Sequence, residues 1–241
     1  MTASESEVSM KANSTELVFI LDRSGSMSGL EADTIGGFNG LLEKQRREDG
    51  EAYVSVVLFD DLTEVLYDRE DIRKVEPMND TQYYVRGCTA LLDAVGGAIH
   101  HIDRVHHYMK EEDVPEKTLF IITTDGMENA SREYSYSQVK RMVEQEKEKN
   151  HWEFMFLGAN IDAIEVAGRF GISASHAVNY EHDSIGTQLN FEVMSKVVSR
   201  VRKACSAAEM ETVMEDDRML EPVREDYRRR HAGGRHTKHT R

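Results

Sequence analysis

The chain has 241 residues and a net charge of −14, and 31% of its residues are charged. An acidic chain of this kind is poorly suited to binding nucleic acid without sequence preference. Its two cysteines, Cys88 and Cys205, cannot form the disulfide framework of a small secreted domain.

The two ends of the chain differ from its middle. Residues 1–16 are polar, and no apolar run is long enough for a signal peptide or a membrane span. We therefore expect a cytoplasmic protein with a disordered lead over residues 1–15 and one domain over residues 16–205. Residues 206–241 form a charged extension that becomes basic in its last part, RRRHAGGRHTKHTR. Within it, segment 209–225 is either a short helix that packs on the domain or a linker.

The first predicted strand covers residues 17–21, an apolar run typical of a parallel strand buried on both faces. A helix is predicted over residues 28–46, although Gly36 and Gly37 weaken the helical pattern. Residues 52–59 read as the second strand, and the alternation in residues 63–67 indicates a short antiparallel strand at the edge of a sheet.

Strands and helices then alternate to the end of the predicted domain. Strands are predicted over residues 117–125, 153–157 and 176–179, and helices over residues 89–108, 135–149, 163–170 and from 184 onward. This alternation predicts an α/β fold: a Rossmann-like, doubly wound, mostly parallel sheet with one antiparallel edge strand and helices on both faces.

Oxygen-bearing side chains follow two of the predicted strands. Asp22, Ser24 and Ser26 come directly after the first strand, and Asp125 ends a later one, while Thr89 stands at the start of a helix. In doubly wound sheets, ligands bind beyond the carboxyl ends of the strands, where the strand order reverses. Mg²⁺ and similar hard cations prefer oxygen ligands, so the sequence predicts a cation site at this edge.

The set Asp22-x-Ser24-x-Ser26, Thr89 and Asp125-Gly126 resembles the metal-ion-dependent adhesion site (MIDAS) of the von Willebrand factor A-like (VWA) domain family. The resemblance covers residues 17–205 and implies that these residues hold the metal: Asp22, Ser24, Ser26, Thr89 and Asp125. It implies Mg²⁺ or Mn²⁺, or else Ca²⁺, whose open position is filled by an Asp or Glu of a partner protein. Small cytoplasmic members of the family often work beside a separately encoded partner, such as an ATPase or a stress-response system. We therefore predict a monomeric, non-enzymatic, metal-dependent protein-binding module.

Two other functions stay open at this point. A metal-dependent hydrolase or phosphatase would need a second carboxylate two residues after Asp22, where Ser24 stands, or a histidine beside a serine nucleophile. No histidine is predicted at the metal end of the sheet. A scaffold whose metal is purely structural is the other alternative. Taken singly, the same residues also suit helix caps and turns.

Other polar positions have plainer interpretations. We expect an acidic rim around the site, and turn-forming or helix-capping roles explain each of its members: Asp60, Asp61, Glu128, Asn129, Asn160 and Asp162. Four histidines, at positions 100, 101, 106 and 107, are expected on a solvated helix face rather than in a zinc site. Cys88, although next to Thr89, is expected to be a small buried hydrophobic residue.

Overall fold

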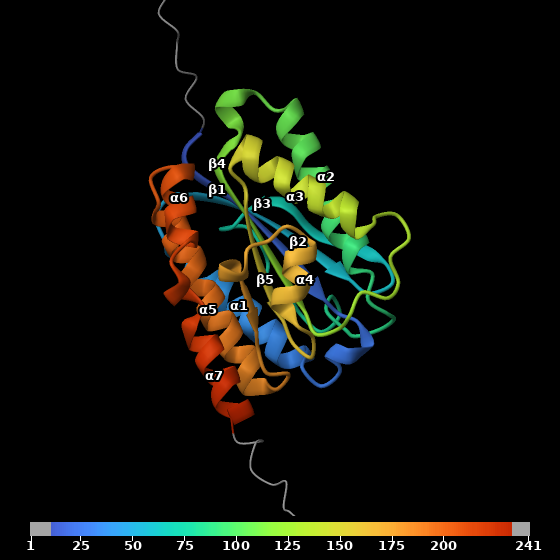
Figure 1. The fold of residues 1–241 in the computed structure, drawn as a ribbon. Helices are drawn as coiled ribbons and strands as arrows, with labels where there is room; N and C mark the ends of the chain where they lie inside the picture. Colours follow the sequence, from blue (N-terminus) through green and yellow to red (C-terminus); the bar gives the residue numbers. More distant parts are fainter. Residues whose placement is uncertain (1–10, 233–241) are drawn as a thin grey trace, which may run out of the picture.

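The apolar run of residues 17–21 lies at the centre of the sheet, where both faces of a strand are covered and both must be apolar. The computed structural model, which describes residues 11–232, has a six-stranded sheet in the order β3-β2-β1-β4-β5-β6 (Figure 1). Neighbouring strands are parallel except β2 and β3, which are antiparallel. The strands are β1 Lys11–Asp22, β2 Glu51–Phe59, β3 Thr63–Asp71, β4 Pro115–Thr124, β5 Glu153–Gly158 and β6 Ala177–Asn179.

Helices cover both faces of this sheet, so the predicted architecture is confirmed (Figure 1). One face packs against α1 (Glu31–Gln45), α5 (Ser184–Lys203), α6 (Ala207–Met214) and α7 (Glu221–Ala232). The other face packs against α2 (Leu91–Tyr108), α3 (Tyr136–Asn150) and α4 (Ala163–Arg169). Alternate side chains of β1 enter the two cores: Phe19 packs with the first set of helices and Ile20 with the second.

The first strand begins earlier than the sequence predicts. Residues 11–15, predicted to lie in a disordered lead, belong to β1, and Ser14 and Thr15 pair with Glu51 and Ala52 of β2. These polar residues lack the apolar signature of a strand, but the ladder to β2 extends to them, and Ser14, Thr15 and Glu16 are buried. The remaining part of the predicted lead, residues 1–10, lies outside the described residues.

The C-terminal extension packs on the domain as far as residue 232. Met210 and Met214 of α6 are buried in the core between the extension and the sheet. Leu220, just before α7, and Val223, in its first turn, are buried there too. Segment 209–225 therefore packs on the domain, as the helical interpretation expects, and the linker interpretation is wrong. It consists of the end of α6, a 3₁₀ turn over Asp217–Met219 and the start of α7 rather than of one short helix. The sequence did not indicate this packing, because the segment has only a few apolar residues among many charged ones and so lacks a clear apolar pattern. Residues 233–241 lie outside the described part.

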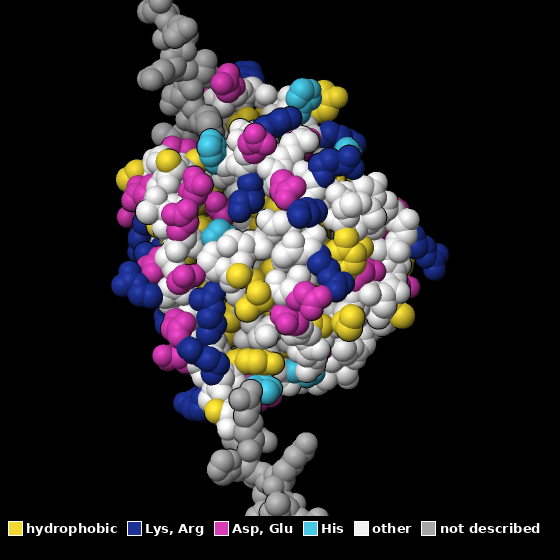
Figure 2. All heavy atoms as spheres, in the orientation of Figure 1, with side chains coloured by type: hydrophobic (Ala, Val, Ile, Leu, Met, Phe, Trp, Pro, Cys, Tyr) yellow, Lys and Arg dark blue, Asp and Glu magenta, His cyan; other side chains and the backbone are white. Residues whose placement is uncertain are grey.

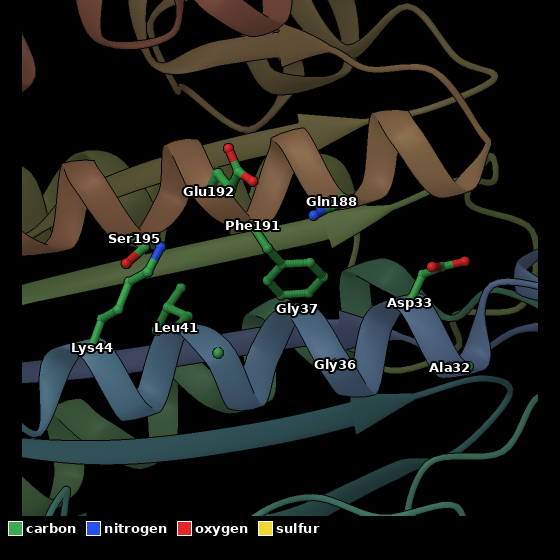
Figure 3. A pocket seen from close by; sticks show the side chains of 11 residues that line it. Ala32, Asp33, Gly36, Gly37, Leu41, Lys44, Gln188, Phe191, Glu192 and Ser195 are labelled. Atoms are coloured by element: carbon green, nitrogen blue, oxygen red, sulfur yellow. The ribbon is translucent and has the colours of Figure 1, made fainter.

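Gly37, the second glycine of the pair in α1, has a packing role. A Cβ atom on Gly37 would lie 2.3 Å from the ring of Phe191 in α5, so only glycine lets the two helices come this close. Figure 3 shows the Phe191 ring lying over Gly37, in a groove of about 400 Å³ between α1 and α5. The reduced helix propensity at Gly36 and Gly37 is thus offset by tertiary packing.

The surface carries many charged side chains, as expected from a chain in which 31% of the residues are charged. On the face shown in Figure 2, basic and acidic side chains are interspersed over α5, α6 and α7. Among residues 11–232, no helix is long and apolar enough to cross a membrane.

Candidate metal centre

Strands β1 and β4 lie side by side at the point where the strand order reverses, with β2 on one side and β5 on the other. Asp22 is the last residue of β1, and Asp125 directly follows β4. The expectation that the two aspartates are neighbours at this edge is therefore confirmed, and both are almost fully buried.

A continuous hydrogen-bond chain links the residues after β1 to those after β4. Oδ1 of Asp22 accepts from the Ser24 backbone N–H at 2.7 Å, and Oδ2 accepts from Thr124 Oγ1 at 2.6 Å. The hydroxyls of Ser24 and Ser26 are 3.0 Å apart, and Ser26 Oγ donates to Asp125 Oδ1 at 2.5 Å.

Thr89 reaches the same place from the loop before α2. A Cβ atom built on Gly126 would lie 3.0 Å from Thr89 Oγ1 and 3.3 Å from Ser26 Oγ, so both hydroxyls border this glycine. The Thr89 backbone N–H donates to Asn129 Oδ1 at 2.9 Å, which ties the Thr89 loop to the loop after β4. The structure thus brings together all five residues of the predicted site.

The chemistry of this cluster suits a small divalent cation. Burial raises the pKa of Asp22 to about 6, against the hydrogen bonds from Thr124 and Ser24. Burial also raises the pKa of Asp125, opposed by Ser26 and the adjacent His182. Two carboxylates removed from water at one spot are costly without positive charge, and a bound cation would offset that cost. Within residues 11–232, no three His, Cys, Asp or Glu side chains gather as a metal site, so an ion here would depend on the hydroxyls.

His182 is a site residue that the sequence analysis missed. It lies in the turn between β6 and α5, and its Nε2 is 2.7 Å from Asp125 Oδ2. The prediction that no histidine stands at the metal end is therefore wrong. The available signal was position, because His182 follows the last parallel strand and so lies at the same sheet edge as Asp22 and Asp125.

Asp60, one residue of the predicted acidic rim, is instead the centre of a buried ion cluster. Its Oδ2 lies 2.8 Å from Nε of the fully buried Arg23 and 2.7 Å from Nε of Arg86. The Arg86 backbone N–H donates to the Arg23 carbonyl at 2.9 Å. Both guanidinium groups lie within 5.6 Å of the Tyr84 ring centre. This cluster fixes the loop that leads to Thr89.

Three more residues of that rim also have structural roles. Glu128 accepts from the Leu92 backbone N–H at the start of α2, and Asn129 accepts from Thr89. Asp162 is the N-cap of α4 and accepts from the Glu165 backbone N–H. The capping interpretation is confirmed for these residues because their oxygens satisfy backbone donors at helix starts and in loops.

The predictions for Cys88 and for the histidines of α2 are confirmed only in part. Cys88 is exposed, so its assignment as a buried residue is wrong: it lies in the loop before α2 rather than under the helix. His100 and His107 are exposed as expected. His106 is not, because its ring packs edge-on against Trp152 at 5.5 Å and its Nε2 lies 3.4 Å from Glu16.

Comparisons with known structures agree with the fold. Proximal thread matrix protein 1 from the mussel byssus has the same fold, with a TM-score of 0.53 and 15% identity over 79% of this chain and 47% of that one. A von Willebrand factor type A protein from Catenulispora acidiphila matches with a TM-score of 0.50 and 15% identity over 83% of this chain and 43% of that one. The chain thus spans about half the length of these relatives.

No curated protein matches the chain. The family model described as "VWA domain containing CoxE-like protein" matches residues 5–148, a segment that contains Asp22, Ser24, Ser26, Thr89 and Asp125. On this match, the chain belongs to the family of VWA domain-containing, CoxE-like proteins.

Proposed function

We propose that this protein is a metal-dependent binding module that captures a carboxylate of a partner protein through a divalent ion. Asp22, Ser24, Ser26, Thr89 and Asp125 would hold the ion at the carboxyl edge of the sheet. The observation that carries the proposal is the chain of contacts from Asp22 through Ser24 and Ser26 to Asp125. It assembles hydroxyls from one loop and carboxylates from two strands at one point.

The donor set itself favours capture of an anion. Three of the five side chains are hydroxyls, which bind a cation without neutralising it, so the ion keeps the positive charge that attracts a carboxylate. The ion would supply only this electrostatic attraction and one open coordination position. Mg²⁺ and Mn²⁺ both suit oxygen donors, and a related mussel protein has been solved with zinc in its MIDAS motif.

Exposed apolar side chains beside the site supply a surface for a partner. Leu62 lies in the turn after β2, Tyr84 in the loop that leads to Thr89, and Met127 directly after Gly126. Their exposed fractions are 62%, 42% and 68%. Loops at one sheet edge that expose large apolar side chains around a polar centre are typical of a protein-binding surface.

The serine geometry favours binding over catalysis. A serine nucleophile needs its hydroxyl next to an imidazole base, whereas Ser26 Oγ donates to the Asp125 carboxylate and His182 lies on the other oxygen of that carboxylate. We therefore propose a non-enzymatic role. Monomeric state and cytoplasmic location stay predictions from the sequence.

Affinity capture with the full chain as bait tests this function. Captures in Mg²⁺, in EDTA, and with the Asp22→Ala variant in Mg²⁺ are compared, followed by Asp→Asn and Glu→Gln scanning of the captured partner. We expect a partner that is retained only by the wild type in Mg²⁺ and that is lost when one of its own carboxylates is removed. Equal retention in EDTA or by Asp22→Ala would contradict the proposal and favour a purely structural ion.

A further inference from the structure

His182 presents its imidazole to the metal centre from an element that contributes none of the five predicted ligands. Its Nε2 lies 2.7 Å from Asp125 Oδ2. Both atoms are buried, and each is the charged partner of the other, with no further hydrogen-bond partner for either atom within the described residues. Buried polar atoms that lack hydrogen bonds are rare, and each calls for an explanation such as an ion not yet accounted for.

The separation of this nitrogen and this oxygen is also close to the spacing of two ligands of one ion. A divalent metal takes imidazole nitrogen and carboxylate oxygen at roughly 2.0–2.2 Å, so neighbouring ligands on such an ion lie roughly 3 Å apart. Asp125 Oδ1 is already engaged by Ser26, which leaves Oδ2 and the His182 nitrogen facing one another.

The turn that carries His182 is held on both sides by the C-terminal helix. Nη1 of Arg230 lies 2.5 Å from Oδ2 of Asp183, and Nδ1 of His231 lies 3.0 Å from Oε1 of Glu181. Asp183 is also the N-cap of α5, where its Oδ1 accepts from the Gly186 backbone N–H at 2.7 Å. The imidazole is thus anchored at both neighbouring residues, as a preorganised ligand should be.

We propose that His182 is a further residue of this metal centre and that its nitrogen makes the site discriminate between divalent ions. Imidazole suits Zn²⁺ and other borderline ions, whereas Mg²⁺ and Ca²⁺ favour oxygen alone. The site therefore binds Zn²⁺ more tightly, relative to Mg²⁺, than its hydroxyls and carboxylates would by themselves. This inference rests on the proposed ion-binding function and adds to it the choice of ion.

Calorimetric titration of the full chain with Zn²⁺ and, separately, with Mg²⁺ tests the proposal in the wild type and in His182→Ala. His107→Ala is the matched control, because it removes an exposed imidazole on α2. We expect His182→Ala to lose about tenfold or more in Zn²⁺ affinity. Its Mg²⁺ affinity should fall by a smaller factor, because the five oxygen-bearing side chains remain, and the control should match the wild type for both ions.

Equal losses for both ions would overturn the inference, since His182 would then only orient Asp125; so would unchanged Zn²⁺ affinity. In either case, Mg²⁺ binding and Mg²⁺-dependent partner capture by the wild type would leave the proposed function standing. Pulsed EPR of the Mn²⁺-loaded wild type gives a second readout that needs no variant. Nitrogen coupling to the bound ion is expected, and its absence would contradict direct ligation by His182.

Discussion

Ser26 shows how much of the site depends on single hydroxyl groups. It is exposed, whereas the other four residues of the predicted site are buried, and its Oγ connects Ser24 to Asp125. A side chain in this position has no role in the core, so packing does not explain its presence there, and the proposed ion site does.

Ser26→Ala should therefore separate ion binding from stability. We expect the affinity for Mg²⁺ to fall about tenfold or more, because one oxygen and the orientation of Asp125 are lost together. The free energy of unfolding without metal should fall by only about 1 kcal/mol, from the hydrogen bond that the buried Asp125 loses. Calorimetry and urea unfolding measure the two quantities.

The matched control is Ser28→Ala, which removes an exposed hydroxyl two residues further along the same loop. Cys88→Ala gives a second comparison beside Thr89 and should leave ion binding unchanged. If Ser28→Ala weakened binding as much as Ser26→Ala, the loop as a whole rather than the Ser26 hydroxyl would be responsible.

The site residues divide into those that a sequence can reveal and those that it cannot. Asp22 and Asp125 are predictable because each ends an apolar strand, and the parallel topology brings strand ends to one edge. His182 was missed although the strand before it was predicted, because it stands three residues beyond the end of that strand, in a turn with no pattern of its own. Asp60 was placed on a rim because nothing local indicates that the buried Arg23 and the distant Arg86 would enclose it.

At the scale of elements, α1 and α5 are the clearest example of packing that overrides local preference. Two adjacent glycines weaken a helix in isolation, yet α1 runs unbroken from Glu31 to Gln45. The close approach of Phe191 to Gly37 explains why the second glycine is present, whereas Gly40 has no neighbouring atom within 4 Å of the position of a Cβ.

Gly37→Ala and Gly40→Ala should therefore have opposite effects. The first inserts a methyl group against Phe191 and should destabilise the protein by about 1–3 kcal/mol despite the better helix propensity of alanine. The second should stabilise it by about 0.5–1 kcal/mol, since alanine gains propensity without a clash. Chemical denaturation measures both. Stabilisation by both substitutions would show that α1 and α5 are further apart than described.

A buried pair at the start of β5 gives a prediction for pH. Oε2 of Glu153 lies 3.4 Å from Nδ1 of His176. Burial raises the pKa of Glu153 to about 7, with Lys147 opposing this shift and Glu211 and Glu215 of the extension adding to it. Burial lowers the pKa of His176 to about 4. Both groups are therefore favoured in their neutral forms.

Glu153→Gln should be more stable than the wild type at high pH. Between pH 4.5 and about 7 the unfolded chain loses the Glu153 proton while the folded chain keeps it, so stability falls as the pH rises through this range. The glutamine removes this loss, a gain of up to about 3 kcal/mol above pH 7 that vanishes near pH 4.

Unfolding curves of both proteins at pH 4, 6 and 8 check this dependence. His176 is present in both proteins, so the difference between them reports Glu153 together with its contact to His176. A stability difference that is the same at all three pH values would contradict the assignment.

For the whole molecule, the main finding beyond the sequence is that the extension, as far as residue 232, packs on the folded domain. The fold, its strand order and its two layers follow from alternating apolar segments, which are long enough to read. The extension is not readable in this way, because its buried residues, such as Met210 and Val223, are separated by charged ones. Its packing depends on tertiary contacts with the sheet face that it covers, and these contacts leave no local pattern in the sequence.

Val223→Asp should therefore destabilise the entire domain and not only α7. A carboxylate at a position that is 1% exposed would lie in an apolar cluster, and we expect a loss of more than about 3 kcal/mol. Glu225→Asp places an aspartate at an exposed position of the same helix, and it should leave the free energy of unfolding nearly unchanged. Circular dichroism at the sheet and helix bands during thermal unfolding measures both. An early, separate helical transition in Val223→Asp would show that α7 melts alone.

The contacts of Arg230 and His231 with the turn that carries His182 have a thermodynamic consequence. If docking of α7 helps the turn present His182 to an ion, then by reciprocity the ion must strengthen the docking of α7 by the same free energy. The population of molecules with α7 in place would then rise and fall with the supply of metal. A partner protein that bound α7 and removed it from the domain would lower the affinity of the site for the ion. Binding at α7 would thus regulate the metal centre from a distance.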